Sequence, residues 1–179
     1  MLTPHRDDLQ RGRRRAVGEV RAAACDHGAA SGVLRQMGEP VSCAIGAMTE
    51  FPQALRAGAG TARSAEFFAF GTNDLTRAIF GLSRDDARRF LPSDVEKGIF
   101  REDPFQLLDQ DGVGRLIRMA VDEGKKTRPG LKVGTSGEHG RESRSVKFCH
   151  QIGLGYMSCS PYHVPIARLD AAHAALEQA

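Results

Sequence analysis

The stretch Phe67-Phe68-Ala69-Phe70-Gly71-Thr72-Asn73-Asp74 decides the fold of this chain. Its first four residues are apolar and stop at a glycine, which is typical of a short buried β-strand. The residues that follow are small and polar. In parallel α/β folds, ligands bind at the carboxyl ends of the strands. We therefore expect a strand over 67–70 whose end carries functional groups.

On both sides of this stretch, short apolar strands followed by helices recur along the chain. Further apolar strands are predicted over 41–48, 131–134 and 156–159. Helices are predicted over 8–25, from Pro52 through Leu55, over 111–123, over 143–151 and from Pro165 onward. Helices alternating with strands that are apolar throughout favour a parallel sheet with helical crossovers. The charged, weakly periodic segment 81–112 is either a decorated loop or a small helical insertion.

Composition excludes several classes of function. The chain has 179 residues with 25 Lys and Arg against 22 Asp and Glu, a net charge of +3 that does not indicate nucleic-acid binding. No apolar run approaches the roughly 18 residues that a membrane-spanning helix needs. The four cysteines are scattered and form no CxxC pair, and no secretory leader is recognisable, so we expect a cytoplasmic protein without membrane contact.

An arginine-rich segment over 6–21 introduces one alternative for location. Transit peptides to organelles are rich in arginine, but they are poor in acidic residues. This segment contains Asp7, Asp8 and Glu19. The sequence therefore favours a solvent-exposed helix face over a transit peptide that would direct the protein to an organelle.

Polar residues after the strands are the candidates for chemistry. Glu50 and Asp74 follow two neighbouring strands, and Mg²⁺ takes one or two carboxylates while water and substrate complete its octahedron. The alternative for either acid is a helix cap. Gly71 and Thr72 allow the backbone to approach an anion closely. No phosphate-loop or dinucleotide pattern is present, and Ser136 lacks the second glycine of a hydrolase elbow.

Taken together, these motifs are far more specific than any one of them. They closely resemble the C-terminal, phosphoenolpyruvate (PEP)-binding domain of the pyruvate, phosphate dikinase family of PEP-utilising enzymes. The resemblance runs from about Ile45 to the end of the chain, whereas residues 1–40 match loosely. It is carried by segments 46–52, 66–76, 80–86, 90–92, 103–105, 112–114, 133–140, 158–161 and 164–168. PEP synthase and the phosphotransferase-system enzyme I share Gly71-Thr72-Asn73-Asp74, but 83–86 and 90–92 favour the dikinase.

The resemblance implies a fold and an activity. The family domain is a (β/α)₈ TIM-type barrel, which takes about 250 residues, so this chain is expected to be an incomplete C-terminal part with the last four to five strands. We expect one partial barrel domain over 1–179, with a helical lead-in over 1–40, strand and helix units over 41–179 and the decorated segment at about 81–112. The family activity is Mg²⁺-dependent phosphoryl transfer between phospho-histidine and pyruvate; the phospho-histidine and nucleotide-grasp domains have no counterpart here.

The resemblance also assigns roles to residues and exposes departures. Glu50 and Asp74 would ligate Mg²⁺, and both would line the pyruvate or PEP site together with Gly71, Thr72 and Asn73. At Ser136 the family carries a cysteine that protonates the enolate, and a serine hydroxyl is a far weaker acid than a thiol, whose pKa is about 8.5. Thr135 and Arg141 also stand where the family has other residues.

Two alternatives to a dikinase-like transferase stay open. One is a catalytically silent, truncated paralogue that binds Mg²⁺ and a small oxyacid, or that pairs with another barrel fragment. The other is a PEP synthase-like or enzyme I-like member of the superfamily. A partial parallel barrel has open strand edges and uncovered apolar surface, so we expect an oligomer.

His139, within the segment 133–140, is expected to be a hydrogen-bonded structural residue.

Overall fold

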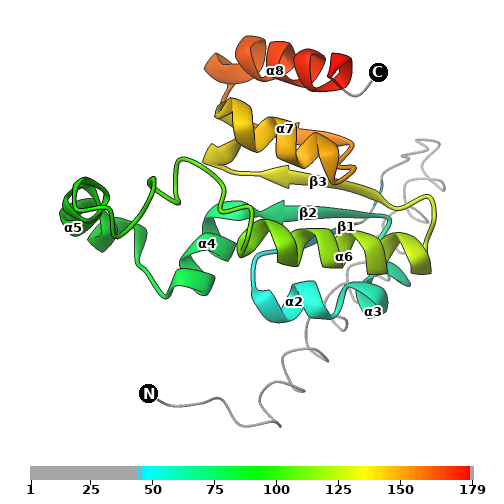
Figure 1. Cartoon of the computed structure of the whole chain (residues 1–179). Helices are drawn as coiled ribbons and strands as arrows, with labels where there is room; N and C mark the ends of the chain where they lie inside the picture. The colour runs from blue at the N-terminus through cyan, green and yellow to red at the C-terminus, as the bar shows by residue number, and fades with distance from the viewer. Residues whose placement is uncertain (1–43, 45, 178–179) are drawn as a thin grey trace, which may run out of the picture.

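The computed structural model describes residue 44 and residues 46–177 of the chain. Within them, four strands form one parallel sheet in the order β1-β2-β3-β4 (Figure 1). The strands are β1 Gly46–Thr49, β2 Phe67–Gly71, β3 Lys132–Ser136 and β4 Tyr156–Ser158. The mixed α/β class and the parallel sheet are thereby confirmed. Closure of a (β/α)₈ barrel and the assignment of 1–179 to a single domain stay predictions.

Helices connect the strands and cover the sheet. Along the chain they are α2 Pro52–Arg56, α3 Gly58–Ala62, α4 Thr72–Phe80, α5 Arg84–Glu96, α6 Val113–Thr127, η1 Glu138–Arg141, α7 Ser143–Gln151, η2 Pro161–His163 and α8 Val164–Leu176, of which η1 and η2 are 3₁₀ turns. Helix α6 packs against α2 and α3, and α7 packs against α8 (Figure 1). None of the helices in the described part of the chain is long and apolar enough to cross a lipid bilayer.

The predicted elements are largely confirmed, with shifted ends. The helix over 143–151 matches α7 at both ends, and the strand over 131–134 lies at Lys132–Ser136. The strand over 41–48 is described only as Gly46–Thr49. The helix over 8–25 and the arginine-rich segment over 6–21 lie outside the described residues.

Two helices escape the sequence pattern for a physical reason. Helix α3 is five residues long and rich in glycine and alanine, too short to show an apolar period. Helix α4 begins at Thr72 directly after the strand, so the small polar residues that follow the strand form the first turn of a helix. Asp74 lies in that first turn, where a negative charge favours the helix because of the backbone dipole.

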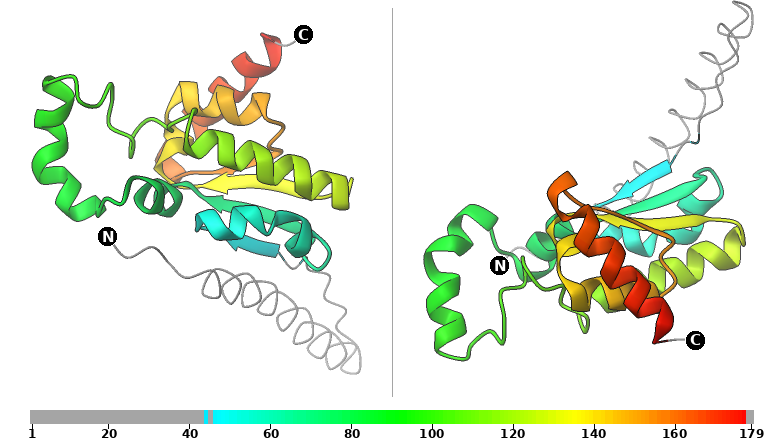
Figure 2. Two further views of the ribbon diagram at one scale, coloured as in Figure 1. Left: turned by 60° about the horizontal axis from the view of Figure 1, so that its bottom comes forward. Right: turned by 90° about the horizontal axis from the view of Figure 1, so that it is seen from above.

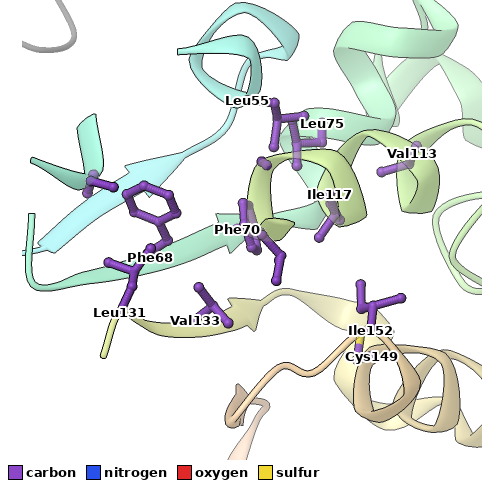
Figure 3. Packing of buried hydrophobic residues seen from close by; sticks show 14 of the residues in the cluster. Leu55, Phe68, Phe70, Leu75, Val113, Ile117, Leu131, Val133, Cys149 and Ile152 are labelled. Carbon is purple, nitrogen blue, oxygen red and sulfur yellow. The ribbon is translucent and has the colours of Figure 1, made fainter. Parts of the chain in front are cut away.

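The core lies on one face of the sheet. Phe68 and Phe70 are two residues apart in β2, so both rings point to the same side, and they meet edge to face with centroids 6.2 Å apart. Both rings are buried together with Leu75 of α4 and Ile117 of α6 (Figure 3). Complete burial of one such side chain stabilises the fold by about 1.5–3 kcal/mol. This face therefore supplies most of the hydrophobic stabilisation.

The opposite face of the sheet is less covered than the sequence suggests. Phe67 and Ala69 are half-buried, and Met48 of β1 keeps 55% of its surface exposed. These apolar residues are therefore not fully buried, although the strands are apolar throughout. Burial alternates with the two-residue period of a strand because the described helices cover one face.

Tyr156 crosses part of that second face. Its hydroxyl donates a hydrogen bond to the backbone carbonyl of Phe68 at 2.8 Å. Its ring lies over Gly134, where an added Cβ would stand 2.5 Å from the ring. Gly134 thus allows the tyrosine of β4 to lie flat across β3 and reach β2, and partial burial raises the pKa of the phenol.

The segment over 81–112 is a helical insertion followed by irregular chain, which decides between the two expectations. Helix α5 stands beyond the carboxyl ends of the strands and away from the sheet (Figures 1 and 2). Ala87 and Leu91 of α5 pack with Phe105 in a small second cluster. The insertion is therefore held by its own apolar contacts and by the irregular chain that returns to α6.

Candidate functional site

The candidate site lies at the carboxyl ends of β1, β2 and β3. The parallel register pairs Thr49 with Phe70 and Gly71 with Ser136, so the residues that follow these strands emerge at one edge of the sheet. This edge faces α4 and α5 (Figure 1). Topology alone thus brings together the segments that carry Glu50, Asp74 and Ser136.

Glu50 and Gly71 form a close pair across β1 and β2. An added Cβ at Gly71 would stand 2.7 Å from Cγ of Glu50 and 3.2 Å from its Oε1. The absence of a side chain at Gly71 is therefore what allows the carboxylate-bearing chain of Glu50 to lie over the end of β2. Gly71 has a φ of −78°, which any L-residue can adopt, so its role here is to leave space rather than to permit an unusual backbone conformation.

The first turn of α4 carries the other predicted groups. Asp74 forms an ion pair with Arg77 on the next turn, with Oδ1 3.1 Å from Nη2, and 41% of its side chain is exposed. An exposed pair of this kind holds its partners weakly, so the carboxylate can exchange Arg77 for another cation. Oδ1 of Asn73 is buried and has no hydrogen-bond partner in the described structure.

The side chain of Thr72 is held inside the protein. The residue is completely buried, and its hydroxyl lies 2.8 Å from Nδ1 of His139 and 3.3 Å from the carbonyl oxygen of Ser136. Nε2 of the same imidazole lies 2.9 Å from the carbonyl oxygen of Pro104. His139 is buried as well. The expectation of a hydrogen-bonded structural histidine is confirmed.

Ser136 ends β3 at the middle of this edge. Its hydroxyl contacts Sδ of Met48 at 4.0 Å, and it is half-buried. The next residue, Gly137, has a φ of +140°, and an added Cβ there would stand 2.6 Å from Oγ1 of Thr72. Glycine is therefore required directly after Ser136. The hydroxyl of Thr135 points the other way and donates to the carbonyl of Phe70 at 3.0 Å, a structural role.

A small cavity of about 190 Å³ opens beside this edge, between the ends of β3 and β4. Arg141 and Glu138 form an ion pair at its rim, 3.3 Å apart. Cys159, a free and half-buried thiol, also lines it. The complete lining is Gly137, Glu138, Arg141, Ser158, Cys159, Ser160 and His163. Arg141 thus has an acidic neighbour within its own 3₁₀ turn.

The donor set at the edge fits a hard divalent cation. Among the described residues, no three side chains of His, Cys, Asp and Glu lie together as a metal cage. The edge carries two carboxylates, Glu50 and Asp74, and the buried, unpartnered Oδ1 of Asn73 lies in the same helix turn as Asp74. Mg²⁺ uses few protein oxygens and keeps waters and substrate oxygens as its other ligands. These residues therefore fit Mg²⁺ better than a cation that requires a complete protein cage, such as structural Zn²⁺.

Sequence reasoning identified the acids and missed their neighbours. Arg77 could have been found, because a basic residue three positions after Asp74 on a helix is a standard ion-pair spacing. Pro104 could not, because it is 35 positions from His139 along the chain. The contact of Met48 with Ser136 spans 88 positions and has no local signal either.

Fold and site together define an α/β domain that gathers its polar groups at the carboxyl ends of parallel strands, the class that binds small ligands there. Comparison with known proteins narrows this class. Residues 17–176 match the family model described as PEP-utilising enzyme, PEP-binding domain, so the match begins upstream of Ile45. The chain belongs to this family.

Three relatives share about half of their aligned residues with the chain. They are pyruvate, phosphate dikinase of Clostridium symbiosum, at 55% identity over 80% of this chain, and the chloroplastic pyruvate, phosphate dikinases 1 of Arabidopsis thaliana, at 54% over 78%, and of Oryza sativa subsp. japonica, at 51% over 82%. The aligned part is 16%, 14% and 16% of these relatives, respectively. The chain thus corresponds to a small part of each relative's length.

Proposed function

We propose that this chain binds PEP or pyruvate together with Mg²⁺ at the carboxyl edge of its sheet, as the substrate-binding part of a pyruvate, phosphate dikinase-like phosphotransferase. The observation that carries the proposal is the placement of Glu50 over Gly71, beside the helix turn that bears Asn73 and Asp74. The family match and the dikinase relatives support the choice of substrate.

Each residue has a separate task in this proposal. Glu50 and Asp74 would hold Mg²⁺, which when bound neutralises negative charge on the carboxylate and enolate oxygens of the substrate. The backbone of Gly71 and Thr72 would orient the substrate through N–H groups, since the hydroxyl of Thr72 is occupied inside the protein. Asn73 would bring a polar group that is already desolvated, so its interaction with the ligand is strong.

The test is calorimetric titration of oxalate, a mimic of enolpyruvate, into the chain with and without Mg²⁺. We expect binding that requires Mg²⁺ and is lost in Asp74→Ala. Asp122→Ala on the exposed side of α6 is a matched control, because it removes an acid of the same kind far from the edge. Equal binding by wild type and Asp74→Ala would refute the metal assignment, and a folded chain without oxalate binding would refute the proposed function.

Ser136 favours a second candidate, a chain that binds these ligands without catalysing the proton transfer. General acid catalysis supplies roughly 10²- to 10⁴-fold, and a serine hydroxyl cannot replace a thiol in that role at neutral pH. The readout is exchange of the methyl protons of pyruvate with deuterated water in the presence of Mg²⁺, followed by NMR. We expect negligible exchange in wild type and measurable exchange in Ser136→Cys. No difference between the two proteins would mean that the serine alone does not silence the site.

We further propose that the chain associates with a second copy of itself. Ile166, Leu169 and Leu176 of α8 are 53%, 57% and 74% exposed, and Met48 and Phe51 are exposed at the opposite end of the strand order. Two four-stranded parallel sheets joined at these borders would provide the eight strands of a barrel. Sedimentation equilibrium should show a dimer that dissociates in Ile166→Glu. A monomeric wild-type chain would refute this proposal.

The cytoplasmic location and the absence of a nucleic-acid partner stay predictions from composition.

A further inference from the structure

His139 joins three segments that are far apart in the sequence. The imidazole lies in η1 after β3, Thr72 begins α4 after β2, and Pro104 belongs to the chain that returns from the α5 insertion. The contacts to Thr72 and Pro104 span 67 and 35 positions. Only 1% of the histidine surface is exposed. A buried ring with a partner on each nitrogen has little freedom to turn.

The partners determine the direction of both hydrogen bonds. A backbone carbonyl can only accept, so Nε2 donates its proton to Pro104. In the neutral ring Nδ1 then carries a lone pair and accepts the hydroxyl proton of Thr72 at 2.8 Å. The carbonyl of Ser136, at 3.3 Å, is the weaker acceptor for the same proton. His139 thereby fixes the rotamer of Thr72.

The fixed threonine supports the edge of the sheet. Its hydroxyl faces Gly137, where an added Cβ would stand 2.6 Å away, and the amide of Asn73 lies against the same glycine, 3.5 Å from that position. Thr72 and Asn73 are therefore seated on the backbone that follows Ser136. A rotation of the Thr72 side chain would remove its hydroxyl from this contact and loosen the packing of the turn against Gly137.

We propose that His139 is a positioning residue: it orients the Thr72–Asp74 turn for the ligand and couples that turn to the insertion through Pro104. The imidazole touches no reacting atom and acts through Thr72. The inference rests on the proposed function for its ligand. The two hydrogen bonds that connect Thr72, His139 and Pro104, called the relay below, can be measured without a ligand. Outer residues of this kind typically change the affinity of a metal site by about 10- to 100-fold when they are replaced.

Two replacements separate the halves of the relay. Gln at 139 keeps a donor near the position of Nε2 and removes the acceptor for Thr72, whereas Asn keeps an acceptor near Nδ1 and removes the donor to Pro104. We expect Mg²⁺-dependent oxalate binding to weaken about 10- to 100-fold in His139→Gln and much less in His139→Asn. Thr72→Val should reproduce His139→Gln, and Thr72→Ser should retain more affinity than Thr72→Val because it restores the hydroxyl.

The double variant His139→Gln/Thr72→Val tests whether the two residues act through one bond. We expect it to bind no more weakly than the weaker single variant, because interacting residues are not additive. If the affinity losses of the two single variants multiply in the double variant, the proposed positioning role is wrong. It is also wrong if a folded His139→Gln binds oxalate with wild-type affinity. Ser145→Ala is the matched control. It removes the 3.0 Å hydrogen bond that the backbone N–H of Leu108 donates to Ser145, and so loosens the segment between α5 and α6 that contains Pro104 without replacing His139. Its oxalate affinity should stay at the wild-type value.

Hydrogen exchange keeps the inference testable if the proposed function fails. Should the wild-type chain not bind oxalate, the amides of the Thr72–Asp74 turn still report on the relay. Faster exchange there in His139→Gln, with an Nε2-protonated neutral ring in the ¹⁵N spectrum of the wild type, supports the positioning role. Unchanged exchange in a folded variant, or an Nδ1-protonated neutral ring, overturns it whether or not the ligand binds.

Discussion

Replacement of Gly71 by alanine is the sharpest test of the edge of the sheet. The backbone there has a φ of −78° and a ψ of 86°, so alanine meets no conformational barrier. It lowers the entropy of the unfolded chain and stabilises the protein by about 0.4–1 kcal/mol. The new Cβ would stand 2.7 Å from Cγ of Glu50, well inside a normal contact. The side chain of Glu50 must then move, and a side chain forced off its rotamer costs about 0.5–1.5 kcal/mol.

These two effects nearly cancel for folding but not for binding. We expect the free energy of unfolding of Gly71→Ala to stay within about 1 kcal/mol of wild type. Displacement of the Glu50 carboxylate should weaken Mg²⁺-dependent oxalate binding at least about tenfold, as loss of support at a metal site typically does. Urea unfolding measures the first quantity, and calorimetry measures the second.

Gly130→Ala is the control for this experiment. No atom lies within 4 Å of an added Cβ at Gly130, and its φ is not in the left-handed region. It should leave oxalate affinity unchanged. Wild-type affinity in Gly71→Ala would show that the position of Glu50 over β2 is not needed for the ligand, and the assignment of Glu50 would fall. A large loss of stability would instead show that the edge is rigid and cannot accommodate the methyl group.

Three further predictions concern other groups of the chain. Partial burial disfavours the charged form of Glu142, but hydrogen bonds from Ser145 and Arg144 outweigh it and lower the pKa of this carboxyl. The charged form of Glu142 therefore stabilises the fold fully above its unfolded pKa of about 4.3, and this stabilisation is lost as the pH falls through the lower folded pKa. Glu142→Gln should lower the free energy of unfolding at pH 7 and lower it progressively less in acid. A difference in unfolding free energy between the variant and wild type that is constant across pH would contradict this. Burial raises the pKa of the Cys149 thiol to about 12, so iodoacetamide at pH 8 should label this cysteine only after unfolding, as mass spectrometry of the peptide would show. Gly137→Ala should reduce the free energy of unfolding by at least about 1–3 kcal/mol, because the φ of +140° is strained for alanine; a thermal or urea midpoint equal to that of Gly130→Ala would refute it.

The amino-acid sequence by itself determined the local architecture and the family. Four apolar residues before Gly71 are enough for a strand, and apolar side chains at helical spacing in α6 are enough for a helix, because both signals come from neighbours along the chain. Glu50, Asp74 and Ser136 could be selected in the same way, since Glu50 directly follows β1, Asp74 comes three residues after the end of β2 and Ser136 ends β3. Motifs at fixed spacing carried the resemblance, and the family match over 17–176 bears it out.

Only the tertiary structure decided how these groups meet. Glu50 lies over Gly71, His139 connects Thr72 with Pro104, and burial alternates along β2. Each of these facts depends on atoms that are tens of positions apart in sequence and are brought within a few ångströms by strand register and helix packing. Local pattern contains no information about such distances. For that reason the sequence could select candidate ligands and a structural histidine, whereas the partners of that histidine, Thr72 and Pro104, emerged from the packing.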